Sequence, residues 1–375
     1  MTDVLMALNA GSSSFKFALA ACSAPAVPIL SGAVERIGLG DAGLRIKGPD
    51  IDAVTRNLGA ADHGAALAAV FDEMAASLPG LVIRGVGHRI VHGGERFEAP
   101  EVATDDVLDG IAALVPLAPL HQPHGLRGIQ TGMDLYPDAV HVACFDTAFH
   151  ATKPWVNQAY ALPRTLFDDG LRRYGFHGLA CQSIVDTLRR DGYPVADRKI
   201  AIAHLGNGCS VTAVAGGRSV ATSMGFTALD GLPMGTRCGQ IDPGVLLHLM
   251  RTGHDHDAIE ALLYHQSGLR GLSGLSSDMR DLNAADSPTA KEAIDYFIAR
   301  LVEEICRMAG AMGGLDAVMF SGGIGENDAA IRAAIAQRLA FLTGADSAGV
   351  DMRVCGADEE RVLIEAAHRF VGPRP

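Results

Sequence analysis

The sequence predicts an α/β protein that contains two related halves, and three observations support this prediction. First, residues 4–8 form an unbroken apolar run of buried-strand length, and a polar turn at residues 9–16 leads into a second, alternating strand pattern. Second, the same order of strand, turn and strand recurs at residues 200–214, about 195 residues later, which a duplication explains economically. Third, each half contains one more apolar run, at residues 139–145 and 317–320, that ends in a loop of unusual polar composition. Ligands of open α/β sheets bind at such strand ends.

The length and composition of the chain restrict its class. A chain of 375 residues is too long for one compact core and fits two domains. Its hydrophobic content of 48% with 20% charged residues is typical of a soluble globular protein. The net charge of -12 and the lack of any Lys- or Arg-rich run argue against a nucleic-acid partner, because a phosphate backbone attracts basic surfaces.

The cysteines and the apolar runs bear on the compartment. The seven cysteines are odd in number and contain no Cys-x-x-Cys pair, which indicates reduced thiols in a cytoplasmic protein rather than a disulfide scaffold or a zinc site. The apolar run at residues 4–8 is too short for the core of a signal peptide. No stretch approaches the ~20 apolar residues that a membrane span requires, so we expect no membrane partner.

Hydrophobic periodicity predicts the main helices. Apolar residues recur at steps of three and four over residues 289–312, and a second amphipathic pattern covers residues 61–78. A strand is expected at residues 81–91. Residues 148–178 contain several Pro and Gly with little periodicity, so we place the connection between the halves near there. The long irregular stretch at residues 222–244 is typical of a functional loop.

The two polar turns, at residues 9–16 and 204–210, are suited to phosphate binding. Their Gly and Ser residues let backbone N–H groups converge on an anion, and Lys16 adds a positive charge. An ordinary hairpin explains either turn alone, whereas phosphate binding explains the matched pair better. A Gly-x-x-x-x-Gly-Lys-Ser/Thr loop is absent, since no Lys in the chain follows a Gly. Residues 38–43 match the dinucleotide-binding pattern in letters only, because no convincing strand leads into them and no helix follows.

Several charged residues occur in unusual settings. Arg89 ends an apolar strand pattern, where a guanidinium is normally avoided unless it is paired. Arg237 lies in the irregular stretch, and for either Arg alone a role as surface charge is the simpler explanation. His177 could instead be a buried, hydrogen-bonded histidine of the core. Asp146 could instead cap the end of a strand.

Two other candidates also have simple explanations. Glu359 stands in an acidic run, where it is explained equally by one more solvated charge. His121 and His124 have a spacing that suggests a metal pair, but the intervening Pro123 is incompatible with helical ligand spacing and no third ligand is evident. We therefore expect an anion-contacting or structural histidine there.

Taken together, these segments resemble the acetate kinase family of short-chain acyl kinases. The resemblance extends over nearly the whole chain, and several of the matching segments are seven residues or longer, so chance is not a serious explanation. The segments are Asn9–Lys16, Gly87–Gly94, Pro119–His124, Phe145–His150, Tyr174–Gly178, His204–Gly208, Thr222–Gly239, Ser276–Leu282 and Ser321–Asn327.

The resemblance implies a fold and a set of ligands. The implied fold has two duplicated actin- and hexokinase-like domains, with ribonuclease H-like ββαβα cores, around an interdomain nucleotide cleft. Residues 1–147 with 360–375 would form an N-terminal acyl and phosphate domain, and residues 148–359 a C-terminal nucleotide-binding domain. The resemblance also implies a homodimer that uses ATP or ADP with Mg²⁺, or Mn²⁺ as the alternative cation, and acetate as the second substrate.

The resemblance further implies roles for individual residues, in four groups. The metal site would consist of Asn9 and Glu359, and the catalytic residues would be Asp146, His177 and Arg237. The acyl substrate would contact Arg89 and His121, with Val91, Leu120 and Phe176 around its methyl group. The nucleotide would contact Ser12, Ser14, Lys16, His204, Leu205, Gly206, Asn207, Gly208, Asp278, Met279, Arg280, Gly322, Gly323, Ile324, Gly325 and Glu326. No step of the transfer requires a proton donor, so we expect Asp146 to orient an Arg or a metal-bound water.

Some positions depart from the family pattern. Ala228 stands where the family usually has a Pro that lines the acyl pocket, so the pocket is expected to be slightly roomier and propionate to be a competent second substrate. Ala357-Asp358 replaces a Thr-Asn pair before Glu359, and Cys209 stands where Ala or Gly is usual.

The sequence therefore predicts an acetate kinase that makes acetyl phosphate and ADP, or runs in reverse. The alternatives are a propionate or other short-chain acyl kinase and, in a different class, a nucleotide-driven binding module. A binding module would not need Arg89, Arg237 and Phe176 around an acyl site.

Overall fold

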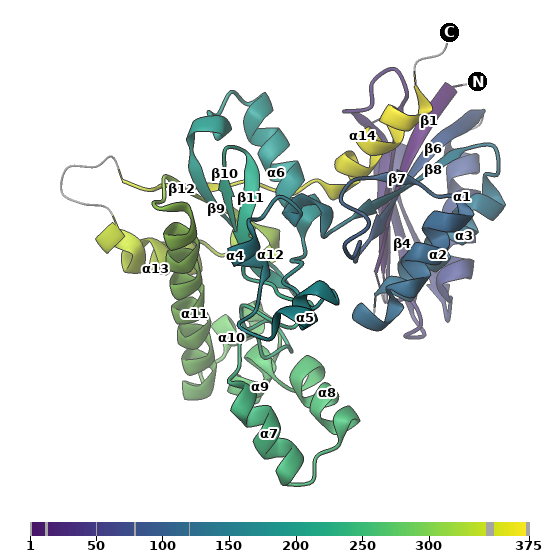
Figure 1. The fold of residues 1–375 in the computed structure, drawn as a ribbon. Helices are drawn as coiled ribbons and strands as arrows, with labels where there is room; N and C mark the ends of the chain where they lie inside the picture. The colour runs from purple at the N-terminus through teal and green to yellow at the C-terminus, as the bar shows by residue number, and fades with distance from the viewer. Residues whose placement is uncertain are drawn as a thin grey trace. The chain divides into compact units, whose positions relative to one another are not determined.

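The computed structural model describes residues 2–11, 14–49, 51–78, 80–119, 121–342 and 349–372 (Figure 1). The chain divides into two compact units, which are described separately below. The first unit contains Met1–Ala148 and Asp358–Pro375, and the second contains Phe149–Ala357. Among the helices described, none is both long enough and apolar enough to cross a membrane.

The first unit is built on an eight-stranded sheet with the order β5-β4-β3-β2-β1-β6-β8-β7. β1 to β5 form an antiparallel meander, and β6 and β8 run parallel to β1. The strands are β1 (Thr2–Ala10), β2 (Phe15–Ala21), β3 (Pro28–Glu35), β4 (Ala42–Gly48), β5 (Ile51–Gly59), β6 (Leu81–Ile90), β7 (Glu101–Val102) and β8 (Val140–Phe145).

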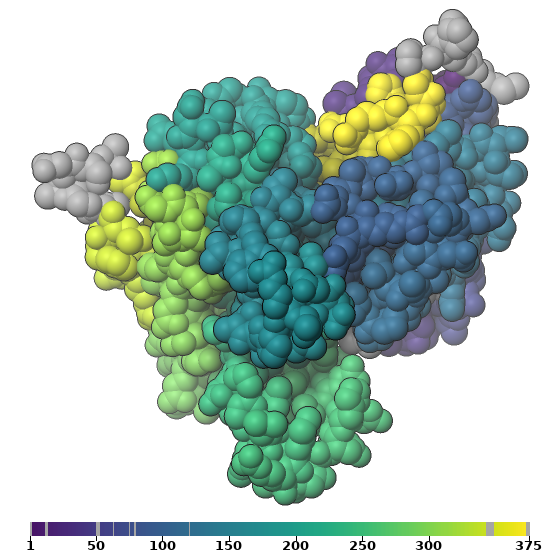
Figure 2. Space-filling view, in the orientation of Figure 1, coloured from purple at the N-terminus to yellow at the C-terminus, as the bar shows by residue number. Residues whose placement is uncertain are grey.

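Helices cover both faces of this sheet (Figure 1). α1 (His63–Ser77), α2 (Asp105–Ala113) and α3 (Gln122–Leu135) lie on one face, together with the short η1 (Val115–Leu117). On that face Val4, Met6 and Leu8 of β1 are buried in one core with residues of α1, as the alternation of side chains along a strand requires. The C-terminal helix α14 (Glu359–Val371) packs on the other face against β1, β6 and β8. Figure 2 shows α14, in yellow, lying over the N-terminal residues of this unit.

The second unit is built on a five-stranded sheet with the order β11-β10-β9-β12-β13. β9 pairs antiparallel with β10 and parallel with β12. The strands are β9 (Lys199–Leu205), β10 (Cys209–Ala215), β11 (Arg218–Thr222), β12 (Ala317–Ser321) and β13 (Asp351–Val354). β9 and β12 are almost completely buried, as expected for central strands covered on both faces.

The remaining elements of the second unit are helical. α6 packs in one apolar core with residues of β9, β10 and β12, and the long α11 contacts β9, β10 and β11. Figure 1 shows α7 and α8 extending away from the sheet. The helices are α4 (Trp155–Gln158), α5 (Arg164–Asp168), α6 (Gly178–Arg190), η3 (Val195–Asp197), α7 (Pro243–Arg251), α8 (His256–His265), α9 (Gly268–Ser273), α10 (Met279–Ala284), α11 (Pro288–Met312), α12 (Gly322–Asn327), α13 (Ala329–Leu339) and η4 (Ala340–Leu342), and η2 (Ala148–His150) lies at the boundary of the units.

The two sheets repeat one arrangement. The central order β3-β2-β1-β6-β8 of the first unit has the same strand directions, where they correspond, as β11-β10-β9-β12-β13 of the second. In each unit the repeat begins with two antiparallel strands joined by a polar turn, β1 and β2 or β9 and β10. A later strand, β6 or β12, then pairs in parallel with the first strand of that pair. The predicted α/β class and the repeated strand, turn and strand are thus confirmed.

The edge of the first sheet differs from the sequence expectation. A strand, β3, does lead into residues 38–43, ending at Glu35, and the hairpin partner β4 begins at Ala42. The expectation that no strand precedes this segment was wrong, because the buried Leu30 and Val34 of β3 are separated by the small or polar Ser31, Gly32 and Ala33, which weaken the alternation. A strand follows instead of a helix, so the exclusion of a dinucleotide loop is unaffected.

Two glycines of β6 allow α14 to lie close to the sheet. A Cβ atom on Gly87 would lie 2.2 Å from the carbonyl oxygen of Leu363, and one on Gly85 would lie 2.6 Å from Cγ2 of Val371. Real Cβ atoms do not approach backbone this closely, so any other residue at position 87 must push the helix away. The position of α14 matters because its first turn carries Glu359 and Glu360.

We therefore expect Gly87→Ala to lower the free energy of unfolding by about 1–3 kcal/mol, the usual cost of overpacking. The measurement is urea denaturation followed by circular dichroism. The control is Gly43→Ala in β4, where an added Cβ would meet nothing within 4 Å. Equal unfolding midpoints for the two variants would contradict the proposed contact.

Candidate active site

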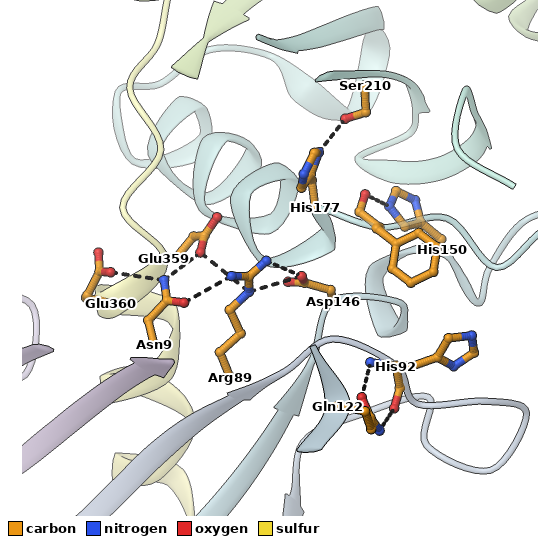
Figure 3. A network of polar contacts seen from close by, with 11 residues as sticks. Asn9, Arg89, His92, Gln122, Asp146, His150, His177, Ser210, Glu359 and Glu360 are labelled. Carbon is orange, nitrogen blue, oxygen red and sulfur yellow. Dashed lines mark hydrogen bonds and ion pairs between the residues drawn. The ribbon is translucent and has the colours of Figure 1, made fainter. Parts of the chain in front are cut away.

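Polar side chains from four elements meet at one edge of the first sheet (Figure 3). Asn9 is near the end of β1, Arg89 is near the end of β6, and Asp146 directly follows β8. These three strands are parallel, so their carboxyl ends lie together. The first turn of α14 adds Glu359 and Glu360 to the same cluster.

Hydrogen bonds connect the members of this cluster. Arg89 donates from Nη2 and Nε to Oδ2 of Asp146, at 2.6 and 3.0 Å, and from Nη1 to Oδ1 of Asn9 at 3.1 Å. The amide nitrogen of Asn9 donates to Oε2 of Glu359 at 2.8 Å and to Oε1 of Glu360 at 3.1 Å. Arg89 Nε also lies 3.9 Å from Oε2 of Glu359. One guanidinium and one amide thus hold three carboxyl groups together.

The electrostatics of the cluster favour a cation. Burial alone would lower the pKa of Arg89, but the charges of Asp146, Glu359 and Glu360 outweigh it and raise that pKa above its ordinary value. Burial and the charge of Glu359 raise the pKa of Glu360. A carboxyl group whose pKa is raised beside another carboxylate is a group whose negative charge is incompletely compensated.

The oxygen atoms of the cluster fit a small divalent cation. Mg²⁺ prefers carboxylate and amide oxygens and keeps several waters, so Asn9, Glu359 and Glu360 supply a suitable set. Asn9 presently turns its nitrogen toward the two glutamates, and rotation of its amide would present the oxygen instead. Glu360 was not among the residues expected from the sequence; its place in the first turn of α14, directly after Glu359, was the available signal.

The first polar turn is a hairpin beside this cluster. Gly11 N donates to the carbonyl of Ser14 at 2.7 Å, and Asn9 pairs with Lys16 across β1 and β2. Lys16 is exposed, and its charge acts to lower the pKa of Glu360, against the larger effects that raise it. Ser12 lies outside the described residues.

The loop after β6 carries the residues expected near the acyl group. Val91 is 8% exposed. The amide of Gln122, which is fully buried, accepts from His92 N at 3.0 Å and donates to His92 O at 2.8 Å, so it ties this loop to the first turn of α3. His121 is the N-cap residue of α3. Leu120 lies outside the described residues.

The second polar turn has its own cluster within the second unit. His177 has a left-handed backbone (φ 59°) directly before α6, and its Nδ1 is 3.0 Å from the hydroxyl of Ser210 (Figure 3). Its Nε2 lies 3.1 Å from the place where a Cβ on Gly208 would be. The rings of His177 and His204 are 4.9 Å apart. The structure thus brings the predicted His177 beside the turn His204–Gly208.

The glycine-rich segment after β12 lies against the same turn. A Cβ on Gly322, which has a φ of 77°, would meet the carbonyl of Leu205 at 2.5 Å, so only glycine allows this approach. The carboxylate of Glu326 accepts a hydrogen bond from the backbone N–H of Gly322, the first residue of α12, at 2.9 Å. His204 Nδ1 lies 3.4 Å from the hydroxyl of Ser321. Residues 204–208 and 322–326, both expected to contact the nucleotide, are therefore neighbours.

The third predicted nucleotide segment begins α10. Asp278 caps this helix and accepts hydrogen bonds from the backbone and side chain of Arg280, which lower the pKa of Asp278 to about 2. Met279 is buried. A Cβ on Gly235 would touch both Asn207 and Ser277, so this segment and the second polar turn both lie next to Gly235.

Arg237 lies in the irregular stretch, as expected, and is half-buried. Its Nη1 donates to the carbonyl of Ala228 at 3.2 Å, and burial lowers its pKa. Within the described part of the chain, Arg237 forms no ion pair with a carboxylate, in contrast to Arg89. Arg237 is therefore a partly desolvated cation available to an anionic ligand. Arg89 and Arg237 belong to different units, and the expectation that both surround one acyl site stays a prediction.

Comparisons with known proteins give one consistent result for the sequence. A model of the acetokinase family matches residues 4–366. The acetate kinase of Methylocella silvestris is 43% identical over 384 residues, which cover 97% of this chain and 94% of that protein. The acetate kinase of Rhodopseudomonas palustris strain TIE-1 is 44% identical over 365 residues, which cover 95% and 91%.

Solved structures agree with the sequence relatives. A propionate kinase from Francisella tularensis has a TM-score of 0.89 at 33% identity, with 98% of this chain and 99% of that chain covered. Acetate kinase from Porphyromonas gingivalis has a TM-score of 0.85 at 31% identity, with 99% and 100% covered. The matches extend over whole chains and confirm both the resemblance seen in the sequence and the predicted duplicated fold.

The Arg89–Asp146 pair can be tested by its effect on stability. We expect Asp146→Asn to lower the free energy of unfolding by about 1–3 kcal/mol, because Arg89 loses the carboxylate that accepts two of its hydrogen bonds and keeps Glu359 only at 3.9 Å. Urea denaturation followed by circular dichroism measures this effect.

The exposed pair of Arg96 with Asp106 provides the matched control. Asp106→Asn should change the free energy of unfolding by less than about 1 kcal/mol, as is usual for surface ion pairs. A cost for Asp146→Asn no greater than that for Asp106→Asn would contradict the organising role of the Arg89–Asp146 pair.

Proposed function

The chain belongs to the acetokinase family and is a kinase with a carboxylate acceptor, and we propose that it transfers the γ-phosphoryl group of ATP to acetate, reversibly and with Mg²⁺, to give acetyl phosphate and ADP. The observation that carries this proposal is the division of charge between the two candidate clusters. The cluster in the first unit, with Arg89 and three acidic residues, suits a cation, whereas the cluster in the second unit, with Arg237 and the two glycine-rich segments, suits phosphate. A Mg-nucleotide needs both kinds of site.

The acidic cluster is proposed as the metal site. Asn9 and Glu359 would hold Mg²⁺ with most of its waters retained, and Glu360 would add a further carboxylate nearby. When bound, the cation supplies charge neutralisation for the nucleotide phosphates. Lys16, on the strand opposite Asn9, would contact the same phosphates.

Acetate is already a nucleophile at neutral pH, so the residues around it need to align it and not to deprotonate it. Asp146 is occupied by two hydrogen bonds from Arg89. This supports a role for Asp146 in orienting Arg89, which would bind the acetate carboxylate, and not in proton transfer.

Arg237 and His177 are proposed to act on the phosphoryl group. When the hydroxyl of Ser210 donates to Nδ1 of His177, the proton of the imidazole is on Nε2, which faces the turn at Gly208. His177 can then donate to a phosphoryl oxygen held by that turn. Arg237 would neutralise charge that develops on the equatorial oxygens in the transition state.

Substrate choice depends on the apolar residues around the acyl group. Val91, Leu120 and Phe176 are proposed to surround the methyl group, and Ala228 leaves more room than proline would. Arg237 donates to the carbonyl of Ala228, so the width of the pocket and the position of Arg237 are linked. Propionate is the second candidate substrate for this reason.

A homodimer in the cytoplasm is the proposed state of the enzyme. Exposed apolar side chains gather on α7, namely Val245, Leu247 and Met250, and exposed apolar patches of this kind mark interaction surfaces. The odd number of cysteines and the lack of a Cys-x-x-Cys pair support a reducing compartment.

The reaction is tested by trapping the acyl phosphate as a hydroxamate. With Mg-ATP we expect product from acetate. Propionate should react about 10- to 200-fold more slowly than acetate, and butyrate more slowly still, because one methylene is worth ~1–3 kcal/mol in such a pocket. Chelation of Mg²⁺ should abolish product, and Mn²⁺ should restore it. Failure to form acyl phosphate from any of the three acids would leave the nucleotide-driven binding module as the remaining function.

The role of Arg237 is tested by Arg237→Ala. We expect kcat to fall about 10²- to 10³-fold, the usual effect of removing one donor that stabilises the transition state. The KM for ATP should change little, since Arg237 is not among the residues predicted to contact the nucleotide. Arg218→Ala, an exposed residue of β11, is the control and should be neutral. A kcat for Arg237→Ala close to that of the control would contradict the proposed role.

A further inference from the structure

Lys153 is a buried lysine to which the reaction above gives no role. It is 3% exposed and lies in the second unit, between η2 and α4. Its ammonium group donates to the backbone carbonyls of Arg173, at 2.9 Å, and Tyr174, at 2.5 Å. Lysine is almost never fully buried unless it is paired, so this location requires an explanation.

The carbonyls that accept from Lys153 belong to residues just before Phe176 and His177, which are two residues of the candidate site. Gly175, Phe176 and His177 follow directly along the chain, and two of these have left-handed backbone, Gly175 with φ 84° and His177 with φ 59°. A left-handed conformation at a residue other than glycine persists only where the surroundings enforce it. The segment 173–177 therefore depends on its contacts.

Lys153 and His150 supply such contacts from one short stretch of chain. His150 Nε2 donates to the carbonyl of Phe176 at 2.9 Å, and its Nδ1 accepts from the hydroxyl of Ser219, also at 2.9 Å. The amides of Tyr174 and Gly175 donate to the carbonyl of Gly225, at 3.0 and 3.2 Å. The segment is thus held on one side by Lys153 and His150 and on the other by the irregular stretch that carries Arg237.

The stretch that contains Lys153 is itself fixed to β11. Thr152 donates to the carbonyl of Ser219 and Asn157 to that of Val220, both at 2.8 Å. The side chain of Gln158 donates to the carbonyl of Lys153 at 2.5 Å. Lys153 therefore connects the segment 173–177 to a stretch of chain that is hydrogen-bonded to β11.

We propose that Lys153 is a positioning residue that holds Phe176 and His177 in the geometry required for phosphoryl transfer. The part of this inference that concerns catalysis rests on the proposed function, which gives Phe176 and His177 their roles. The part that concerns backbone order rests only on the contacts of Lys153.

The groups that face Lys153 also make its charge sensitive to pH. Burial, and then the charge of Arg173, lower the pKa of Lys153 to about 7. Burial and Lys153 lower the pKa of His150 to about 3, so His150 is neutral. Tyr174 meets Lys153 through its backbone carbonyl, and its phenol donates to the carbonyl of Gly170 at 2.8 Å. Arg173 is paired with Asp230 at 2.7 Å, with its guanidinium over the ring of Tyr160. As the pH rises through about 7, Lys153 loses the charge that strengthens both of its hydrogen bonds.

The decisive variant is Lys153→Met, which removes both donors but keeps the side chain long and apolar. We expect kcat to fall and the KM for acetate to rise, each about tenfold or more, because small misplacements in an active site cost about 10²-fold in rate. The KM for ATP should stay within about twofold of the original value. The wild-type kcat should decline as the pH rises through about 7, and this step should be absent from the variant.

Two further variants complete the kinetic test. Lys153→Gln keeps an amide that can donate to both carbonyls, so it should recover activity relative to Lys153→Met and lack the pH step. Lys199→Met is the control, because Lys199 also donates to a backbone carbonyl, that of Gly313 at 2.9 Å, but this hydrogen bond is exposed to solvent. The inference is overturned if the fall in kcat of Lys153→Met equals the fraction of that variant that is unfolded and its KM for acetate is unchanged. It is also overturned if the decline of kcat through about pH 7 persists in that variant.

Amide hydrogen exchange separates this inference from the proposed reaction. In Lys153→Met the amides of Tyr174 and Gly175 should exchange at least about tenfold faster, while those of β9 are unchanged, because exchange reports local opening. Unchanged exchange at both amides overturns the inference even if the enzyme is an acetate kinase. Faster exchange supports the structural role of Lys153 even if no acyl phosphate is formed.

Discussion

The ion pair between Arg89 and Asp146 is the interaction on which the acidic cluster of the first unit depends. Asp146, Glu359 and Glu360 would repel one another at the ends of the parallel strands without a cation among them. Arg89 supplies that cation from β6, and Asn9 distributes the remaining hydrogen bonds between Arg89 and the two glutamates. The positive charge of Arg89 thus stabilises an arrangement in which three parallel strands and α14 bring acidic side chains together.

The same pair limits what Arg89 can do for a substrate. Two of its donors are occupied by Asp146 and one by Asn9, so Arg89 is pre-organised and only partly free to bind an anion. Arg237 differs, since its described contacts are a carbonyl and a thioether. The two arginines therefore differ: side chains hold Arg89 in place, whereas Arg237 is available to an anionic ligand.

Duplication explains why both units offer a site at equivalent strand ends, and divergence explains why the sites differ. In the first unit the turn after β1 lies beside carboxylates from α14. In the second, the turn after β9 lies beside glycines from α12, where backbone groups approach closely. The common strand order sets the location, and the different helices beside the two turns, α14 with its glutamates and α12 with its glycines, make the two clusters differ.

The sequence predicted the elements whose side chains carry a strong periodic signal. The apolar run before the first turn and the helical pattern at residues 289–312 correspond to β1 and α11 within a few residues. β3 to β5 were missed: in β3 small and polar residues interrupt the apolar pattern, whereas the alternation of Ala42, Leu44 and Ile46 in β4 did carry a strand signal. An edge strand is stabilised by pairing with its neighbour, and that partner is not visible in local sequence.

The site was predictable to the extent that motifs identified it. His177, the turn at residues 204–208 and the segment at residues 322–326 carried recognisable patterns and are neighbours in the structure. Lys153 carried none, because its partners are carbonyl groups about twenty residues away, and any residue type supplies a carbonyl. Glu360 was hidden in an acidic run that resembles a solvated helix start.

The left-handed His177 connects these observations. Its backbone is unfavourable for a residue with a Cβ atom, yet this conformation directs its ring toward Gly208, where an added Cβ would lie 3.1 Å from Nε2. The cost must be offset on both sides of the residue. Downstream, α6 begins at once and its core residues are buried; upstream, Lys153 and His150 bind three carbonyls of the preceding residues. A histidine held in this way can donate to a phosphate without reorganising, which is the property that electrostatic catalysis requires.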